Sequence, residues 1–266
     1  MQRATETVQR ILEAHHHLRL HPELTSSEKY EVFRKLENLV DDDVEKAQSV
    51  LHDPRVEAVQ RFLRKNYLNC IYQLEVDWVR SFLSSPQRFI ENDYIKYEQY
   101  RLRAFFEYYC FIMVANRKPK RSLFIGCGPF PLTSIIMSSN FDISIDYLDK
   151  RAEALYLAEN LLKRIRLNKS PQFFQAEAES FSKIEEYDAI FVAGSVGETK
   201  EEKGRIIQHL CGGMKKGQVL MLRPPYLLEK LLIPEIDLPS LTDMEVYTLQ
   251  LSSEEDIVYR FLIRKP

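Results

Sequence analysis

Two patterns of hydrophobic and polar positions divide the chain. Up to about residue 116, apolar side chains recur every three or four positions, which is the spacing of one helix face. All eight glycines lie from Gly126 onward. The stretch "TSSEKYEVFRKLENLV" adds a capping signal, with Ser26 or Ser27 ahead of the acidic Glu28. The pattern therefore predicts an all-helical N-terminal domain over residues 1–116.

Two long helices are expected within this half. One runs through "VEAVQRFLRKNYLNCIYQLEVDWVRSFL" and ends at Pro86, and the other runs through "DYIKYEQYRLRAFFEYYCFIMVAN", which is dense in aromatic residues. The acids of "DDDVEKAQ" are expected at a helix start, where they meet the positive end of the helix dipole.

From residue 117 onward, short apolar runs alternate with amphipathic segments. The expected strands are 122–126, 143–149, 171–175, 187–193 and 217–223, and the expected helices are 131–140, 150–166 and 199–213. Such alternation predicts βαβ units and a mostly parallel sheet. The last two strands, "MEVYTLQLS" and "EDIVYRFLIRK", are joined by the short turn "SEE" and predict an antiparallel C-terminal edge. The fold class is therefore α/β, with helices followed by a Rossmann-like domain over residues 117–266.

The first strand of this domain runs into a glycine turn. Ligands of open parallel sheets bind beyond the carboxyl ends of the strands. Here Gly126-Cys127-Gly128-Pro129 lets a ligand approach the backbone closely, and the following helix offers free N–H groups to an anion, with a hydroxyl from Thr133 or Ser134. The third glycine of a dinucleotide fingerprint is missing, so a pyrophosphate is a poor fit.

Acidic or small residues end the next three strands. Asp149 ends the second strand, where an acid typically accepts both ribose hydroxyls, whereas Asp146 is separated from the helix start by three residues and is less favoured. Glu177 follows the third strand, where it would accept from an adenine amino group. Ala193 and Gly194 end the fourth strand and are small enough to line a ligand closely. The alternative for Asp149 is that it merely caps the next helix.

Composition narrows the class of protein. The formal net charge of −2 over 266 residues argues against a nucleic-acid partner held by phosphate neutralisation. The four cysteines are far apart with no CxxC pair, which fits free thiols in the cytoplasm and no zinc knuckle. The three successive histidines at 15–17 would project about 100° apart around a helix, so their side chains cannot converge on one ion and no metal site is expected there. No signal peptide or membrane-spanning run is evident, and a soluble, cytoplasmic protein without a membrane partner is expected.

These motifs resemble a known family. "FIGCGPFPLTSI" resembles the "GSGPLPLTS" loop of nicotianamine synthases, and residues 188–223, which contain "VGETKEEK", resemble another stretch of that family. "LRKNYLNCIYQLE" and "YIKYEQYRLRAFFEY" resemble the tyrosine-rich helices of its N-terminal domain. The resemblance covers roughly residues 60 to 234.

The resemblance implies an S-adenosylmethionine-dependent transferase that moves the 3-amino-3-carboxypropyl (aminobutyrate) group to an amine. S-adenosylmethionine is then the co-substrate, 5′-methylthioadenosine is the product, and catalysis needs no metal. The Rossmann-like domain would bind S-adenosylmethionine, and the helical domain would carry the acceptor site and act as a lid. Tyr100 matches the family's acceptor-site tyrosine. Tyr97 lies three residues earlier on the same helix face and is a second catalytic candidate, with a place in the aromatic core as its alternative. The resemblance places Arg223 and Tyr226 in substrate binding.

Glu75 matches an acceptor-site glutamate of the family. It lies in the mostly apolar helix "YQLEVDWV", where burial would raise its pKa and favour proton transfer. The alternative is a surface carboxylate between apolar ridges. Arg223 ends the fifth strand at the ligand edge, where a guanidinium would clamp a substrate carboxylate through two parallel hydrogen bonds.

One departure from the family concerns the acceptor. After the arginine, family members that make nicotianamine carry a glycine and then a second arginine, whereas this chain has "RPPYLLEKLLIP", with Glu229 or Lys230 near the missing arginine. The departure favours the bacterial opine-metallophore (staphylopine-type) branch. In that branch one aminobutyrate is added to an amino acid such as histidine, and an opine dehydrogenase acts next. A homodimer is compatible with the aromatic-rich helices. The alternatives are a small-molecule methyltransferase that uses S-adenosylmethionine and a non-enzymatic scaffold.

Overall fold

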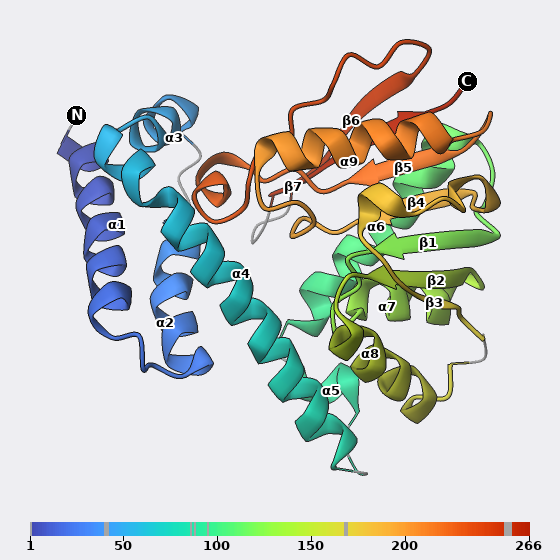
Figure 1. Cartoon of the computed structure of the whole chain (residues 1–266), viewed down its shortest axis with the longest axis horizontal. Coiled ribbons are helices and arrows are strands. Elements are labelled where there is room, and N and C mark those ends of the chain that lie inside the picture. The colour runs from blue at the N-terminus through green and yellow to red at the C-terminus, as the bar shows by residue number, and fades with distance from the viewer. Residues whose placement is uncertain are drawn as a thin grey trace. The chain divides into compact units, whose positions relative to one another are not determined.

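The computed structural model in Figure 1 describes residues 2–39, 43–85, 87, 89–94, 96–167, 170–252 and 257–266. The predicted helix end at Pro86, the first two acids of "DDDVEKAQ" and the turn "SEE" lie outside the described residues. The chain forms two units: Met1–Leu74 with Pro225–Glu235, and Glu75–Pro224 with Ile236–Pro266. They are called here the N-terminal unit and the sheet unit.

Helices build the N-terminal unit. It contains α1 (Gln2–Leu20), α2 (Ser26–Glu37), α3 (Val44–Leu51), the first part of α4 (Pro54–Leu83) and the short 3₁₀ helix η3 (Leu227–Leu231). The capping box predicted before α2 is present, but its cap is Thr25, one residue before Ser26. The Thr25 hydroxyl accepts from Glu28 N at 3.3 Å, and the Glu28 carboxylate accepts from Thr25 N at 2.8 Å. Asp43 caps α3 through its side chain, which accepts from Lys46 N at 3.0 Å.

The segment after the fifth strand belongs to the N-terminal unit. Lys230 O accepts hydrogen bonds from Gln60 Nε2 at 3.1 Å and from Arg64 Nη2 at 2.6 Å, both from α4. Leucines of η3 join the apolar core of α1 to α4, whose buried members include Ile11, Phe33, Val50, Leu63, Leu228 and Leu231. The two units thus divide at 74/75 and around 225–235, whereas the sequence placed a single boundary after residue 116.

The sheet unit contains seven strands in the order β3-β2-β1-β4-β5-β7-β6. Strands β1 to β5 pair in parallel, and β7 pairs antiparallel with both β5 and β6. Their bounds are β1 (Arg121–Ile125), β2 (Ser144–Asp149), β3 (Phe173–Gln175), β4 (Ala189–Val192), β5 (Val219–Leu222), β6 (Glu245–Ser252) and β7 (Ile257–Arg264). Strand order in the middle of the sheet reverses at β1, which places the ligand edge at the ends of β1 and β4. The predicted fold class is confirmed.

Helices cover both faces of this sheet. They are α6 (Tyr97–Ala115), α7 (Leu132–Phe141), α8 (Ala152–Arg164) and α9 (Lys200–Gly213), and the unit also contains α5 (Ile90–Asp93) and the second part of α4 (Figure 1). Ile206 and Leu210 of α9 pack on Leu220 and Leu222 of β5. Because side chains alternate along a strand, Met221 and Arg223 point to the opposite face, and α6 contacts β5 and β7 there. No helix in the described part of the chain is long and apolar enough to cross a membrane.

Asp146 has a structural role inside the sheet unit. Its carboxylate is 3% exposed, accepts from Arg121 Nε at 3.0 Å and Nη2 at 2.8 Å, and also accepts from Gln172 N and the Tyr187 hydroxyl. These bonds join β1 and β2 to the segments before β3 and β4. The Asp146 carboxylate therefore stabilises the fold. This agrees with the sequence-based expectation that Asp149, rather than Asp146, binds the ribose.

Substituting Asp146 with alanine should destabilise the sheet unit by about 3 kcal/mol, because it leaves Arg121, Tyr187 and a backbone N–H without their buried acceptor. Urea unfolding followed by fluorescence of Trp78, the one tryptophan of the chain and part of the sheet unit, measures this loss. Glu159→Gln is the control, because it removes only an exposed ion pair with Lys163 and should cost less than about 0.5 kcal/mol. Equal midpoints for the two variants would contradict the assigned role.

Candidate functional site

The glycine loop leaves β1 in a conformation that favours glycine. Gly126 has φ +72° and Gly128 has φ +62°, both in the left-handed region. A Cβ at Gly126 would lie 2.2 Å from Val196 Cγ2, so this glycine is required for packing. A Cβ at Gly128 would meet only the Glu75 carboxylate within 4 Å. Gly128 is therefore the position where the backbone is open to a ligand.

Asp149 ties this loop to the end of β2. Its Oδ2 accepts from Gly128 N at 2.9 Å, and its Oδ1 accepts from Arg151 N at 2.9 Å. The second bond goes to Arg151, which is itself the N-cap of α8, and this helix has no side-chain cap, so the alternative that Asp149 merely caps the helix does not hold. Each carboxylate oxygen has a second lone pair, which leaves acceptor capacity for ligand hydroxyls. Asp149 thus shapes the loop and can still bind a ribose.

Glu75 of α4 lies against the same loop. Its Oε2 would be 3.0 Å from a Cβ built on Gly128. Burial raises the pKa of Glu75 to about 8, and the negative charge of Asp149 adds to this effect. The alternative of an ordinary surface carboxylate does not hold, because Glu75 is only partly exposed and borders the loop. The arrangement creates a carboxyl group that exchanges its proton near neutral pH.

The two candidate tyrosines have different surroundings. Burial raises the pKa of Tyr100, and the charge of Glu75 raises it further, which places Tyr100 in the electrostatic field of Glu75. Burial also raises the pKa of Tyr97, but the next contribution comes from Glu91 of α5. The structure therefore brings Tyr100 together with Glu75, while Tyr97 interacts with another group.

An aromatic cluster next to Glu75 was not predicted. Trp78, one turn after Glu75, stacks on Phe130 of the glycine loop with ring centroids 4.3 Å apart. Tyr94 packs edge-on against both rings and lies 5.9 Å from the ring of Tyr100. Two sequence signals pointed to this cluster. Trp78 lies three residues after Glu75, and Phe130 stands between two prolines.

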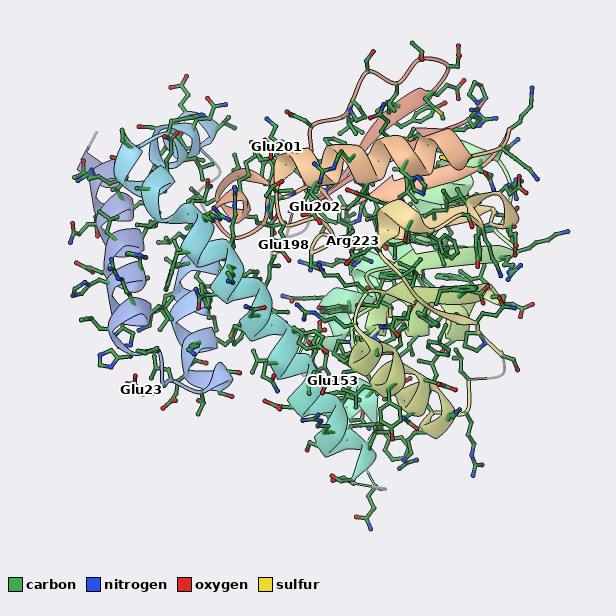
Figure 2. The ribbon with its side chains drawn as sticks, in the orientation of Figure 1. Glu23, Glu153, Glu198, Glu201, Glu202 and Arg223 are labelled. Carbon is green, nitrogen blue, oxygen red and sulfur yellow. The ribbon has the colours of Figure 1, made fainter. Side chains whose placement is uncertain are left out.

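Arg223, labelled in Figure 2, follows β5 and is fixed by a buried glutamate. Its Nε and Nη2 donate to the two oxygens of Glu107 of α6, each at 2.8 Å, and its Cζ lies 5.1 Å from the ring centroid of Phe124. Arg260 of β7 donates to the same carboxylate at 2.6 Å. The guanidinium edge that was expected to clamp a substrate carboxylate is therefore used by Glu107.

The other predicted cofactor residues have varied surroundings. Burial raises the pKa of the Cys127 thiol, as do the charges of Asp149 and Glu75, so the thiol stays protonated. Pro129 and Thr133 are buried, and Glu177 is exposed at the start of the 3₁₀ helix Ala178–Ser180. Among the described residues, none of these side chains forms a hydrogen bond with Glu75.

The end of β4 is held from α9. Ala193 N donates to Ile125 O at 3.0 Å, and Gly194 O accepts from the buried Lys203 Nζ at 2.6 Å. A small cavity beside these residues is almost entirely apolar, and it is lined by Val192, Ala193, Val196, Lys203, Ile206, Ile207, Leu222, Arg223 and Ile236. Because Glu75, Tyr100 and the glycine loop do not line it, this cavity is not the candidate site.

Tyr226 lies in the N-terminal unit, together with the segment whose sequence departs from the family pattern. Tyr226 N donates to Glu229 Oε2 at 2.8 Å, and Lys230 Nζ pairs with Glu235 at 2.6 Å. Glu229 and Lys230 thus have partners inside that unit. The role of Tyr226 in substrate binding stays a prediction.

Within the described ranges, no group of three or more histidine, cysteine, aspartate or glutamate residues is placed to hold a metal ion.

The strand order and the glycine loop define a Rossmann-like fold. The family model for nicotianamine synthase protein matches residues 1–265, and the chain belongs to that family. Nicotianamine synthase 2 of Arabidopsis thaliana is 34% identical over 158 residues, which cover 55% of this chain and 47% of that protein. Nicotianamine synthase of Solanum lycopersicum is 28% identical over 64% of this chain and 55% of its own length. The chain thus spans about half the length of the curated relatives it matches.

Solved structures share the fold over the whole chain. A crystal structure of MtNAS in complex with MTA and tNA has a TM-score of 0.79 and 18% identity, and the match covers 98% of this chain and 97% of MtNAS. A glutamate-to-glutamine variant of MtNAS in complex with S-adenosylmethionine has a TM-score of 0.75 and 15% identity, with 97% and 98% covered.

Replacing Glu75 with glutamine should change how stability depends on pH. The pKa of Glu75 is about 8 in the folded chain and ordinary in the unfolded chain, so the folded state holds the extra proton between these values. Stability of the wild type should therefore fall as the pH rises from about 4.5 to 8, by about 4 kcal/mol, and the variant should lack this loss. Urea unfolding at pH 5 and pH 8.5 measures it. Asp77→Asn, an exposed carboxylate two residues away, should keep the wild-type slope.

Proposed function

We propose that this protein transfers the aminobutyrate group of S-adenosylmethionine to the amine of an amino acid and releases 5′-methylthioadenosine. The observation that carries the proposal is the Glu75 carboxyl, with a pKa of about 8, against the open glycine of a Rossmann-like ligand loop. Membership of the nicotianamine synthase family supports the same reaction class.

The residues at the strand ends fit a nucleoside joined to a methionine chain. A Cβ at Gly128 would meet only the Glu75 carboxylate within 4 Å, and Asp149 keeps acceptor lone pairs for two ribose hydroxyls. S-adenosylmethionine supplies an electrophilic carbon next to a sulfonium, so the protein must orient the incoming amine and take its proton. These roles fall to the residues that surround Glu75.

Glu75 is suited to accept that proton. During the transfer a C–N bond forms, the C–S bond to methylthioadenosine breaks, and the positive charge moves from sulfur to nitrogen. The nitrogen then loses a proton, which the ionised Glu75 carboxylate takes up. A base works best when its pKa lies near the working pH, because a large fraction of it is then ionised while its affinity for a proton is still high. Tyr100 lies in the same field and, in this proposal, orients the amine.

The acceptor is proposed to be histidine, with one transfer per cycle, as in opine-metallophore biosynthesis. Support comes from the sequence after Arg223, where the glycine and second arginine of the nicotianamine-forming members are absent. Glu229 and Lys230, near the missing arginine, are bound inside the N-terminal unit. The product would be an amino acid carrying one aminobutyrate arm, ready for an opine dehydrogenase that joins a 2-oxo acid.

Incubation of the full chain with S-adenosylmethionine and single amino acids, read by mass spectrometry, tests the reaction and the acceptor. The expected result is one aminobutyrate adduct of histidine together with methylthioadenosine. A threefold condensation product without added amino acid would overturn the opine assignment. Formation of S-adenosylhomocysteine would favour the methyltransferase alternative. The absence of both products and of S-adenosylmethionine binding would favour a scaffold.

Glu75→Gln should lower kcat/KM by at least about 100-fold, since it removes the proton acceptor while preserving the shape of the side chain. Wild-type kcat/KM should rise with pH and level off above about pH 8, where Glu75 is ionised, and the variant should lose this rise. The affinity for methylthioadenosine, measured by calorimetry, should be unchanged. The exposed Asp77→Asn serves as the control, and full activity of Glu75→Gln would rule out the role as base.

A further inference from the structure

A buried lysine lies inside the segment that joins β4 to α9. Lys203 is only 3% exposed, and its Nζ donates to Gly194 O at 2.6 Å. Gly197 has φ +82°, in the left-handed region, and a Cβ there would lie 2.6 Å from Lys203 Cγ. Residues 193–199, called here the β4 loop, therefore fold around this side chain, with Gly194 at its head and Gly197 against its stem.

The β4 loop packs against the glycine loop that follows β1. Val196 N donates to Ala193 O at 3.1 Å, which closes a turn. The Val196 side chain meets Gly126, because a Cβ built on Gly126 would lie 2.2 Å from Val196 Cγ2. Ala193 N also donates to Ile125 O at 3.0 Å, directly before Gly126. The glycine loop is thus supported by Val196 from the β4 side and by Asp149 from the β2 side.

The far end of the β4 loop reaches the strand on the other side of the glycine loop. Glu198 of this loop, labelled in Figure 2, has its Oε1 3.5 Å from Lys150 Nζ, and Lys150 directly follows β2. In the sheet, β1 lies between β2 and β4. The β4 loop therefore spans the carboxyl end of β1, where the ligand of an open parallel sheet binds.

Burying the Lys203 ammonium costs free energy, because the cavity beside it is almost entirely apolar and the charge leaves water. A methionine of similar length would avoid this cost. A hydrogen bond from an ammonium is, however, stronger than one from a neutral donor. Charged groups in such a conflict with their surroundings are typical of functional positions. The lysine is therefore suited to fix Gly194 rather than to stabilise the apolar core.

We propose that Lys203 is a positioning residue for nucleoside binding. Its ammonium fixes Gly194, and this fixes the turn that carries Val196. Val196 in turn holds the glycine loop in the shape that the ligand needs. The ligand class is the adenine nucleoside that S-adenosylmethionine and methylthioadenosine share. The inference rests on the proposed function, in which that nucleoside binds at the glycine loop.

Lys203→Met tests this role, because methionine keeps the stem and removes the ammonium. The affinity of the full chain for methylthioadenosine, measured by calorimetry, should weaken about tenfold, as expected for the loss of one charge-assisted hydrogen bond. Lys200→Met is the matched control. It makes the same change three residues earlier in α9, where Lys200 forms an exposed ion pair with Asp237 at 2.6 Å, and it should bind within about twofold of the wild type. Equal affinities of the two variants would overturn the proposal.

A double-mutant cycle tests whether Lys203 acts through Val196. Val196→Ala shortens the side chain that meets Gly126 and should by itself weaken methylthioadenosine binding about fivefold. The double variant Lys203→Met/Val196→Ala should bind no more than about twofold more weakly than Lys203→Met alone. Losses that simply multiply, or wild-type affinity of Val196→Ala, would contradict the proposal. Because Val196→Ala retains the lysine, it also provides the test if Lys203→Met fails to fold.

The reaction gives a further readout that a merely structural role would not produce. Because Glu75 is not part of this path, Lys203→Met should raise the KM of S-adenosylmethionine about tenfold and keep kcat within about threefold of the wild type. A fall in kcat with an unchanged KM would overturn the assigned role. A wild type that binds methylthioadenosine but forms no aminobutyrate product would refute the proposed function, whereas the binding comparisons would still test Lys203.

Discussion

The Asp149 carboxylate is the interaction on which the candidate site depends. One oxygen holds Gly128 N, and the other holds Arg151 N, so a single side chain fixes both the loop after β1 and the turn into α8. Its charge also raises the pKa of Glu75 beyond the effect of burial alone. One residue thus fixes the loop geometry and adds to the rise in the pKa of the proposed base that burial causes, so a change at Asp149 would alter both.

The elements of the sheet unit could be predicted because their signals are local. The expected strand 122–126 is observed as Arg121–Ile125, and the expected helix 199–213 as Lys200–Gly213. Alternating short apolar runs and glycine turns specify such elements without knowledge of distant partners. The sequence also ranks Asp146 below Asp149 as a candidate ligand, because Asp146 lies farther from the start of the next helix. The cap of α2 was misplaced by one residue, because "TSS" offers three successive hydroxyl groups with equivalent capping chemistry.

The features that sequence analysis missed depend on partners far apart in the chain. Glu107 lies 116 residues from Arg223 and 153 from Arg260. The sequence signal was a lone acid in the apolar run "AFFEYYCFIM", which indicates a buried partner but does not identify it. The docking of 225–235 onto α4 was missed for the same reason: its leucines predict burial, and only the folded N-terminal unit shows what covers them.

The charges of the sheet unit suggest how the proposed reaction would select one of the carbons next to the sulfonium. All of these carbons are electrophilic, so the position of the amine decides which one is attacked. In the proposed reaction, Glu75 holds the amine against Gly128, and Asp149 fixes that part of the loop through Gly128 N. Selectivity would then follow from the position of Glu75 relative to the nucleoside bound at the same loop.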